Sequence, residues 1–356
     1  MKKVVVAMSG GVDSSVAAYL LKEDGYDVIG ITMQIWQNED MAEVENRGGC
    51  CGQTAVEDAR FVCNKLNIPH YTLNFRDIFK KRVIDYFAKE YLNGRTPNPC
   101  IACNRYVKWQ NLLSRASALG ANYIATGHYA KIIKKAGRLT ICQADSTKDQ
   151  SYALYNLSQE QLGQTLFPIG CLSKDEVRKI AAEKIGLRVA NKPDSQEICF
   201  IQDNNHPLFL EKYLGKTVPT GDFLDESGAV LGRHKGITHY TIGQRKGLGI
   251  AFGCPMYVKE INASSNAVIL STNDKLFSRL AVVEDLNFML KKEFIGELRC
   301  FGKIRYTHKA APCVIVHKNN VIECCFDEAQ RAITPGQAAV FYDNEGNIIC
   351  GGTIRY

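Results

Sequence analysis

The chain has 356 residues, a length that predicts two or three domains, and its 46% hydrophobic and 23% charged residues are typical of a globular protein. No apolar run is long enough to span a membrane, and the first is too short for a signal-peptide core, so we expect a cytoplasmic protein without a membrane partner. The net charge of +7 favours a polyanionic partner. Fourteen cysteines in a cytosolic chain predict buried thiols, metal ligands or catalytic groups, not a disulfide framework.

The chain begins with a predicted buried strand, Val4–Val6, which leads into a glycine turn and an amphipathic helix. In such a junction the glycines let the backbone approach an anion, and the first helical turn points its N–H groups at it. The loop is not a Walker loop, because no Gly-Lys-Ser/Thr follows the glycines. We therefore predict a phosphate-binding loop formed by Ala7, Met8, Ser9, Gly10, Gly11, Val12, Asp13, Ser14 and Ser15.

The first half of the chain continues as alternating strands and helices. The expected strands are Val28–Thr32, Tyr71–Leu73 and Tyr123–Thr126, and the expected helices are Thr54–Leu66, Ile78–Leu92, Val107–Leu119 and Leu172–Ile185. This alternation predicts a doubly wound parallel sheet, with ligands beyond the carboxyl ends of its strands. The phosphate loop, Met33 and the pair Gly127-His128 lie at such ends, so we expect them to share one nucleotide crevice. The last helix has Ser173 as its expected N-cap, with Glu176 at capping-box spacing.

The alternation stops after about Asn204. A central region rich in glycine and charge follows, and then short strands with turns begin near Arg279. The clearest hairpin pairs Ala338–Tyr342 with Ile348–Ile354. We predict three domains, 1–204, 205–278 and 279–356, of which the last is a small β-barrel or sandwich.

A Cys-x-x-Cys motif lies in the segment Thr96–Asn104. Its two prolines predict an extended approach that keeps a helix from starting early, which places Cys100 and Cys103 just before the next helix. The helix dipole, with Arg105 and Lys108 nearby, favours the thiolate, which is both a nucleophile and a metal ligand. Half of a structural zinc site is the alternative, but the sequence has no matching second Cys-x-x-Cys.

Three segments together resemble the bacterial tRNA-specific 2-thiouridylases of the PP-loop ATP pyrophosphatase superfamily: Ser9–Ser15, Asn98-Pro99 with Cys103, and Ser195–Cys199. Further segments fit in family order, namely Gly49–Cys51, Val56–Arg60, Ala125–Tyr129, Lys148–Tyr152 and Thr241–Gly249. The resemblance runs from about Lys3 to the C-terminus. It implies an adenine nucleotide alpha-hydrolase (PP-loop) sheet domain, a central domain that binds tRNA, and a C-terminal β-barrel.

The resemblance also implies a reaction. Such a sulfurtransferase adenylates the C2 oxygen of the wobble uridine, position 34, with ATP held by the loop, Met33 and Gly127, while Mg²⁺ screens the phosphates. A sulfur-relay protein delivers sulfur to Cys199 as a persulfide. Cys103 is then the catalytic nucleophile, and the two cysteines end as a transient disulfide.

Contacts with tRNA are implied as well. Asn98, Pro99 and Cys100 would border the flipped-out target base. The implied tRNA-binding residues are His128, Lys148, Asp149, Gln150, Arg305, Tyr306 and Gln337. Residues 291–318 carry a net charge of +5, and Arg305–Lys309 adds aromatic and hydroxyl groups suited to phosphate and base contact.

The chain departs from the family at Cys100, where many members have Asp. In one interpretation Cys100 is a tolerated replacement. In the other, Cys100, Cys103 and Cys199 hold three corners of a [4Fe–4S] cluster, whose open iron binds the incoming sulfur.

Two other functions compete with tRNA thiolation: a PP-loop ATP pyrophosphatase acting on a small molecule, and a silent tRNA-binding protein. The paired cysteines argue against the first, and the intact loop with Cys199 argues against the second. Cys50-Cys51 are expected to order their loop, and a monomer is the default expectation. The cysteines expected in the core are Cys63, Cys142, Cys171, Cys300, Cys313, Cys324 and Cys350.

Overall fold

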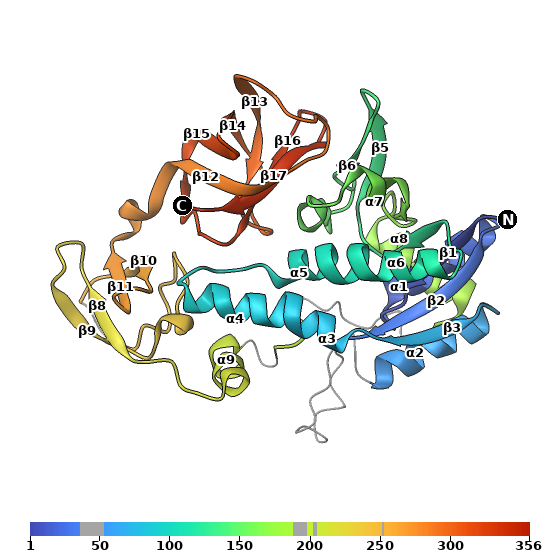
Figure 1. Cartoon of the computed structure of the whole chain (residues 1–356), viewed down its shortest axis with the longest axis horizontal. Helices are drawn as coiled ribbons and strands as arrows, with labels where there is room; N and C mark the ends of the chain where they lie inside the picture. Colours follow the sequence, from blue (N-terminus) through green and yellow to red (C-terminus); the bar gives the residue numbers. More distant parts are fainter. Residues whose placement is uncertain (36–52, 188–197, 202–204, 251–252) are drawn as a thin grey trace. The chain divides into compact units, whose positions relative to one another are not determined.

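The computed structural model describes residues 1–35, 53–187, 198–201, 205–250 and 253–356 (Figure 1). Two parts of the segments that carry the resemblance, Gly49–Cys51 and residues 195–197 of Ser195–Cys199, lie outside these ranges. The chain forms two compact units. The first comprises Met1–Val83, Cys100–Phe200 and Glu345–Ile348, and the second comprises Ile84–Pro99, Ile201–Asn344 and Ile349–Tyr356.

A five-stranded sheet with the order β3-β2-β1-β4-β7 organises the first unit, and all of its strand pairs are parallel. The strands are β1 (Lys3–Ala7), β2 (Asp27–Gln34), β3 (His70–Asn74), β4 (Tyr123–Ala125) and β7 (Thr165–Leu166). The predicted doubly wound parallel sheet is therefore confirmed. The strand order changes direction at β1, between β2 and β4, and in such sheets this switch point is where ligands bind.

Helices surround this sheet. They are α1 (Val12–Glu23), α2 (Gln53–Lys65), α3 (Arg76–Phe79), α5 (Pro99–Ala102), α6 (Leu113–Ala118), α7 (Gln159–Gly163) and α8 (Lys174–Ile180), with π-helical turns at Lys80–Ile84, Cys103–Leu112 and Ala181–Ile185 and a 3₁₀ turn at Ser151–Leu154. Successive side chains of β1 point to opposite faces. Val4 and Val6 join the apolar cluster of α1, α2 and α8, while Val5 is fully buried on the other face. Burial on both faces explains why β1 is an unbroken apolar run.

The helix that follows the two prolines begins earlier than predicted. The sequence suggested a start at Val107, but α5 begins at Pro99 and continues through the π-helical turns to the end of α6 (Figure 1). Proline is favoured at the first helical position, because its missing N–H is not needed there. Cys100 therefore lies in the first turn, and Cys103 lies inside the helical run instead of before it.

A short hairpin of β5 (Lys131–Lys135) and β6 (Arg138–Cys142) was not predicted. Its two turn residues, Ala136 and Gly137, both have positive φ, at 49° and 77°. This is the backbone that a tight two-residue hairpin requires.

The second unit contains a small sheet of order β10-β11-β8-β9 and a closed barrel of order β12-β15-β14-β13-β16-β17. Its helices are α4 (Asp85–Leu92) and α9 (His206–Leu214), with 3₁₀ turns at Ile237–His239 and Asn273–Leu276. The sheet strands are β8 (Gly221–Leu224), β9 (Val230–His234), β10 (Tyr257–Asn262) and β11 (Ala267–Ser271). The barrel strands are β12 (Phe277–Phe288), β13 (Glu297–Lys303), β14 (Ala311–Lys318), β15 (Val321–Arg331), β16 (Ala338–Tyr342) and β17 (Ile348–Ile354).

The predicted C-terminal barrel and the bounds of its last hairpin are confirmed, since β16 and β17 are neighbours in it. Pairing of β12 with β17 closes the barrel, so its strands leave no open sheet edge. Within the described ranges, no helix combines the length and the apolar run that a membrane span needs.

Candidate functional site

The loop between β1 and α1 is stabilised by hydrogen bonds from its own serine hydroxyl groups. Ser14 Oγ and Ser15 Oγ donate hydrogen bonds to the carbonyl of Gly11, at 3.1 and 2.8 Å, and Ser9 Oγ lies 3.2 Å from Ser14 Oγ. Gly11 is the N-cap of α1, and no described side chain caps this end of the helix. The first turn thus presents backbone N–H groups and the positive end of the dipole, which is the arrangement that binds anions.

Two glycines allow other segments to approach this loop closely. Gly10 has a φ of +71°, and a Cβ there would lie 2.5 Å from the carbonyl oxygen of Ala55. A Cβ on Gly127 would lie 2.7 Å from the carbonyl carbon of Asp13 and from the nitrogen of Ser14. Gly127, just after β4, therefore packs directly on the first turn of α1, in line with the predicted crevice.

Asp13 lies in that first turn and makes three strong contacts. Lys174 Nζ, at the start of α8, lies 2.9 Å from Asp13 Oδ1 and 3.0 Å from Oδ2. The hydroxyl of Tyr129 donates to Asp13 Oδ1 at 2.8 Å. The sequence patterns indicated a role for neither Tyr129 nor Lys174. Tyr129 was part of a family motif, whereas Lys174 only followed a helix cap.

His128 is next to Gly127 and is held as a neutral imidazole. Its ring packs against Trp109 and Phe167, with centroid distances of 5.8 and 6.0 Å, and its Nδ1 hydrogen-bonds to Thr126 Oγ1 at 2.7 Å. Burial first, and then the charge of Lys108, hold the pKa of His128 well below its ordinary value. His128 therefore offers a hydrogen bond and a flat ring, not a positive charge.

The segment Lys148–Gln150 is folded against the backbone beside His128. Gln150 accepts a hydrogen bond from the N–H of Tyr129 with its side chain (3.0 Å) and donates one to the carbonyl of Tyr129 with its main chain (2.8 Å). Asp149 Oδ1 accepts from the N–H groups of Ala144 and Ser151, at 3.0 and 3.2 Å. The structure thus joins predicted tRNA-binding residues to the strand end that carries Gly127.

The three cysteines of interest all belong to the first unit. Cys100 and Cys199 are exposed and Cys103 is half-buried. Phe200, which follows Cys199, is buried edge-on against Phe79 with a centroid distance of 5.6 Å. This contact holds the chain next to the exposed Cys199. Among the described residues, no group of three or more His, Cys, Asp or Glu side chains is arranged to hold a metal ion.

In the second unit, the segment before Asn98 is attached to the strand end that precedes β16. The N–H of Thr96 donates to the carbonyl of Pro335 at 2.9 Å, and Gln337 Nε2 donates to the carbonyl of Thr96 at 2.8 Å. Arg95 Nη1 lies 3.3 Å from Glu284 Oε1 of β12. Gln337, predicted as a tRNA contact, thus has a structural role as well, because it holds the approach to the Asn98–Cys100 motif.

Arg305 and Tyr306 differ in their exposure to solvent. The guanidinium of Arg305 donates to the carbonyls of Ile242 and Ala332, at 3.2 and 2.7 Å, so it stabilises the second unit. Tyr306 is 44% exposed, and Lys303 Nζ lies 5.6 Å from the centre of its ring. Tyr306 is thus the more accessible of the two predicted contacts.

Five of the seven cysteines expected in the core are buried there: Cys63, Cys300, Cys313, Cys324 and Cys350. The prediction is wrong for Cys171, which is exposed, and for Cys142, which is only half-buried. Cys171 precedes the capped start of α8, and this turn faces solvent. Cys142 is the last residue of β6 in a two-stranded hairpin, which is too small to bury every apolar position.

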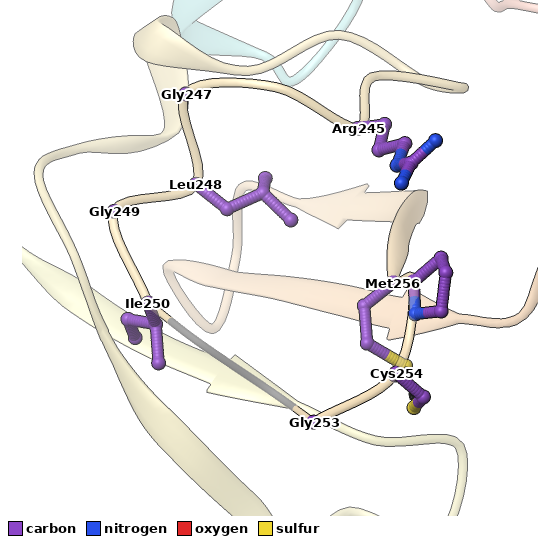
Figure 2. A pocket seen from close by; sticks show the side chains of 9 residues that line it. Arg245, Gly247, Leu248, Gly249, Ile250, Gly253, Cys254 and Met256 are labelled. Carbon is purple, nitrogen blue, oxygen red and sulfur yellow. Dashed lines mark hydrogen bonds between the residues drawn. The ribbon is translucent and has the colours of Figure 1, made fainter.

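The second unit also has an open hollow of about 430 Å³. In Figure 2 the backbone of Gly247 and Gly249 borders it, and the side chains of Arg245 and Met256 lie on another side. It contains none of the predicted site residues.

Comparison with known proteins identifies the family. Family models described as "tRNA methyl transferase HUP domain", "tRNA methyl transferase PRC-barrel domain" and "Aminomethyltransferase beta-barrel domain" match residues 2–203, 208–272 and 278–354. The chain is 58% identical over 355 residues to the tRNA-specific 2-thiouridylase MnmA of Lachnoclostridium phytofermentans, covering 99% of both chains. The chain belongs to the MnmA family. It is also 54% identical to the protein of that name from Clostridioides difficile, covering 99% of this chain and 98% of the relative.

Membership of the MnmA family confirms the resemblance drawn from the sequence motifs. The first model spans the whole sheet from β1 to β7, including the loop, Gly127 and all three cysteines. The chain thus has the N-terminal end of α1, the predicted phosphate-binding loop and the two predicted relay cysteines in one compact unit.

Proposed function

We propose that this protein is a tRNA 2-thiouridylase, which replaces the C2 oxygen of the wobble uridine, position 34, with sulfur. Relatives of that name match it over its full length. The structural observation that carries the proposal is the glycine loop before α1, packed against Gly127 at the switch point of the sheet, in the same unit as Cys103 and Cys199.

The first step of the proposed reaction is adenylation. The uracil O2 attacks the α-phosphorus of ATP, the bond to the β-phosphate oxygen breaks, and pyrophosphate leaves. Residues Ala7–Ser15, with Met33 and Gly127, bind the nucleotide, and the N–H groups at the start of α1 stabilise charge on its phosphates. Adenylation converts a poor leaving group at C2 into AMP.

The second step moves sulfur. The terminal sulfur of the Cys199 persulfide attacks C2, and AMP leaves with the former O2. The Cys103 thiolate then attacks Sγ of Cys199, and the S–S bond to the transferred sulfur breaks. That sulfur gains the two electrons that the cysteines lose as they form a disulfide. A thiol reductant restores both thiols before a sulfur-relay protein loads Cys199 again.

The described residues fit Mg²⁺ and an iron–sulfur cluster differently. Asp13 is a carboxylate at the phosphate loop, and Mg²⁺ is commonly held by one or two carboxylates together with substrate phosphates, where it would screen their charge. The structure does not assemble Cys100, Cys103 and Cys199 into a group that could hold a metal. We therefore route no step through a [4Fe–4S] cluster, and treat Cys100 as a residue beside the target base.

The proposed tRNA contacts lie in two parts of the chain. In the first unit His128, with Lys148–Gln150, offers a neutral ring and an ordered loop, which suit hydrogen bonding and stacking with an unstacked base. In the second, Tyr306 is an exposed aromatic ring beside Lys303. Asn98, Pro99 and Cys100 border the base. We further propose a cytoplasmic monomer with domains 1–204, 205–278 and 279–356, a division supported by the ranges of the three family models.

The name of the family models raises methyl transfer as a second candidate reaction. Methyl transfer needs neither a persulfide nor a thiol that resolves one, so Cys103 and Cys199 favour sulfur transfer. The product distinguishes the two reactions, because mass spectrometry separates an exchange of oxygen for sulfur from an added methyl group.

Replacement of the persulfide cysteine tests the proposal. Cys199→Ser should lower formation of 2-thiouridine by about 10³-fold or more, as expected when a nucleophile is removed. Its affinity for tRNA in a gel-shift assay should stay within about twofold, a change of only ~0.4 kcal/mol. Cys171→Ser is the matched control, since Cys171 is also exposed in the first unit. Full thiolation by Cys199→Ser in a defined assay would disprove the role of Cys199.

A further inference from the structure

Lys174 is placed at the nucleotide loop by a part of the chain 161 residues away from Asp13. We propose that Lys174 is a phosphate ligand of this site, held ready by Asp13 and transferred to the pyrophosphate half of ATP when the nucleotide binds. This inference rests on the proposed function, because it assumes that the loop binds ATP.

The contact is close and largely shielded from water. Lys174 Nζ lies within hydrogen-bond distance of both carboxylate oxygens of Asp13. The Lys174 side chain is only 12% exposed and that of Asp13 is 32% exposed. Removing an ammonium group from water is costly unless an anion stays beside it. Lys174 therefore needs a negative partner in each state of the site.

The ion pair of Asp13 and Lys174 lies at the N-terminal end of α1, where stability alone does not require a lysine. Asp13 is in the first turn of α1, where the helix dipole already favours a carboxylate. A lysine gains nothing from that end of the helix, because the dipole is positive there. The ammonium of Lys174 and the N–H end of α1 thus concentrate positive charge at one point. A polyphosphate has the charge that matches this point.

Two neighbouring features position Lys174 beside Asp13 before any nucleotide binds. Lys174 is the first residue of α8, and Ser173 caps that helix through a capping box with Glu176. The hydroxyl of Tyr129 contacts Asp13, and Lys174 Nζ lies 5.9 Å from the centre of the Tyr129 ring. The backbone of Lys174 is held by the capped helix, while its long side chain can change its hydrogen-bond partner. A side chain placed in this way loses little entropy when it binds phosphate.

The exchange would keep all charges paired. When ATP binds, phosphate oxygens replace Asp13 as the partner of Lys174. The Asp13 carboxylate is then left for the cation that accompanies the polyphosphate. AMP lacks the pyrophosphate half, so its binding should not depend on Lys174.

Calorimetric titration tests this assignment. The titrants are AMP and an ATP analogue with a methylene bridge between the α- and β-phosphates, each with Mg²⁺, on the full-length protein. Loss of a charge-assisted hydrogen bond in Lys174→Gln should weaken binding of the analogue by about 10- to 100-fold. AMP affinity should stay within about twofold (~0.4 kcal/mol). Lys174→Arg, which keeps the charge, should retain most of the affinity for the analogue.

The matched control is Lys179→Gln, which alters an exposed lysine of the same helix α8 and should bind like the wild type. The outcomes separate the two claims. If the wild type does not bind the analogue, ATP use and hence the proposed function fails. If the wild type binds it and Lys174→Gln binds it equally well, or loses AMP affinity to the same extent, the assignment of Lys174 is wrong. If circular dichroism shows that Lys174→Gln folds poorly, Lys174→Arg decides the question. The assignment of Lys174 is then wrong if Lys174→Arg loses affinity for the analogue and for AMP to the same extent.

Discussion

At the scale of single residues, Gly127 packs directly on the backbone of the first turn of α1. An added Cβ would lie 2.7 Å from two backbone atoms of α1, and backbone cannot move aside as a flexible side chain can. We expect Gly127→Ala to displace the start of α1 and to weaken ATP binding by about tenfold or more, a loss near 1.4 kcal/mol. Titration with a non-hydrolysable ATP analogue measures this loss.

The control for that substitution is Gly163→Ala. The nearest atom to a Cβ there is a side-chain carbon of Leu139 at 3.8 Å, an ordinary contact distance. Its melting temperature and ATP affinity should match those of the wild type. Equal ATP affinity of Gly127→Ala and Gly163→Ala would show that the close approach is not needed for nucleotide binding.

Sequence patterns revealed some of these residues and not others. The junction of β1, glycine turn and α1 and the place of Gly127 after a strand could be predicted, because an apolar run followed by glycine marks the end of a buried strand. Lys174 could not be predicted, because a single ion pair between residues 161 positions apart leaves no periodicity or motif in the sequence. Tyr129 was visible only as part of a family motif. Contacts of this kind become apparent only after folding brings the strand ends together.

At the scale of elements, the capping box of α8 can be tested directly. Ser173 Oγ accepts from the N–H of Glu176 at 3.3 Å, and Glu176 Oε2 accepts from the N–H of Ser173 at 2.7 Å. Ser173→Ala should cost about 1 kcal/mol and lower the melting temperature by about 2–4 °C, as measured by calorimetry. Ser173→Thr keeps the hydroxyl and should lose less. If the melting temperature of Ser173→Ala is not lower than that of Ser173→Thr, the N-cap role of Ser173 is wrong.

Helix positions were predicted better than helix starts. The runs over Arg76–Leu92 and Lys174–Ile185 agree with the apolar periodicity. The start at Pro99 was missed because proline was treated as a breaker, although it is well suited to the first turn. The π-helical turns over Cys103–Leu112 have no sequence signal, and such turns often occur at functional sites.

At the scale of the whole molecule, ten of the twelve described cysteines are either buried or exposed, five in each group. Burial raises the pKa of Cys63 to about 12 and also raises that of Cys350, so neither is a thiolate at neutral pH. Brief alkylation of the native protein, read by peptide mass spectrometry, should label Cys100, Cys171, Cys199, Cys254 and Cys325 first and leave Cys63, Cys300, Cys313, Cys324 and Cys350 unlabelled.

Alkylation in denaturant provides the comparison, since every cysteine should react there. Rapid native labelling of the five buried cysteines would mean that the cores open far more often than a stably folded protein allows.

Mild acid should destabilise the fold through its histidines. Burial is the main cause of a lowered pKa for His70, His128, His206, His234, His239 and His308, six of the seven in the chain. The ordinary pKa of histidine is 6.5, so the unfolded chain binds more protons than the folded chain as pH falls through that value. The stability that the neutral histidines contribute above pH 6.5 is therefore lost. The melting temperature should fall between about pH 7.5 and pH 5.5.

The control for this acid effect is His128→Gln, whose melting temperature should fall less over the same interval. Glu176 has a lowered pKa, so the stability that its carboxylate contributes is lost only as pH falls below the ordinary value of 4.5. It therefore does not affect the interval between about pH 7.5 and pH 5.5. An equal fall in both proteins would exclude His128 from the effect.

The overall plan of the chain was largely predictable. The parallel sheet and the barrel follow from the change from strand–helix alternation to short strands with turns. The small sheet of β8 to β11 was expected only as a central domain, because its segments rich in glycine and charge show no clear period.

The attachment of Thr96 to Pro335 and Gln337 also bears on how the protein is made. The segment that leads to the target-base motif is synthesised early, but its hydrogen-bond partners follow roughly 240 residues later. At about 5–20 residues per second, a ribosome needs about 10–50 s to add them. During that interval the nascent chain can form its nucleotide loop, while the approach to Asn98 lacks these partners. A chain released early would therefore be expected to bind ATP without a properly held base site.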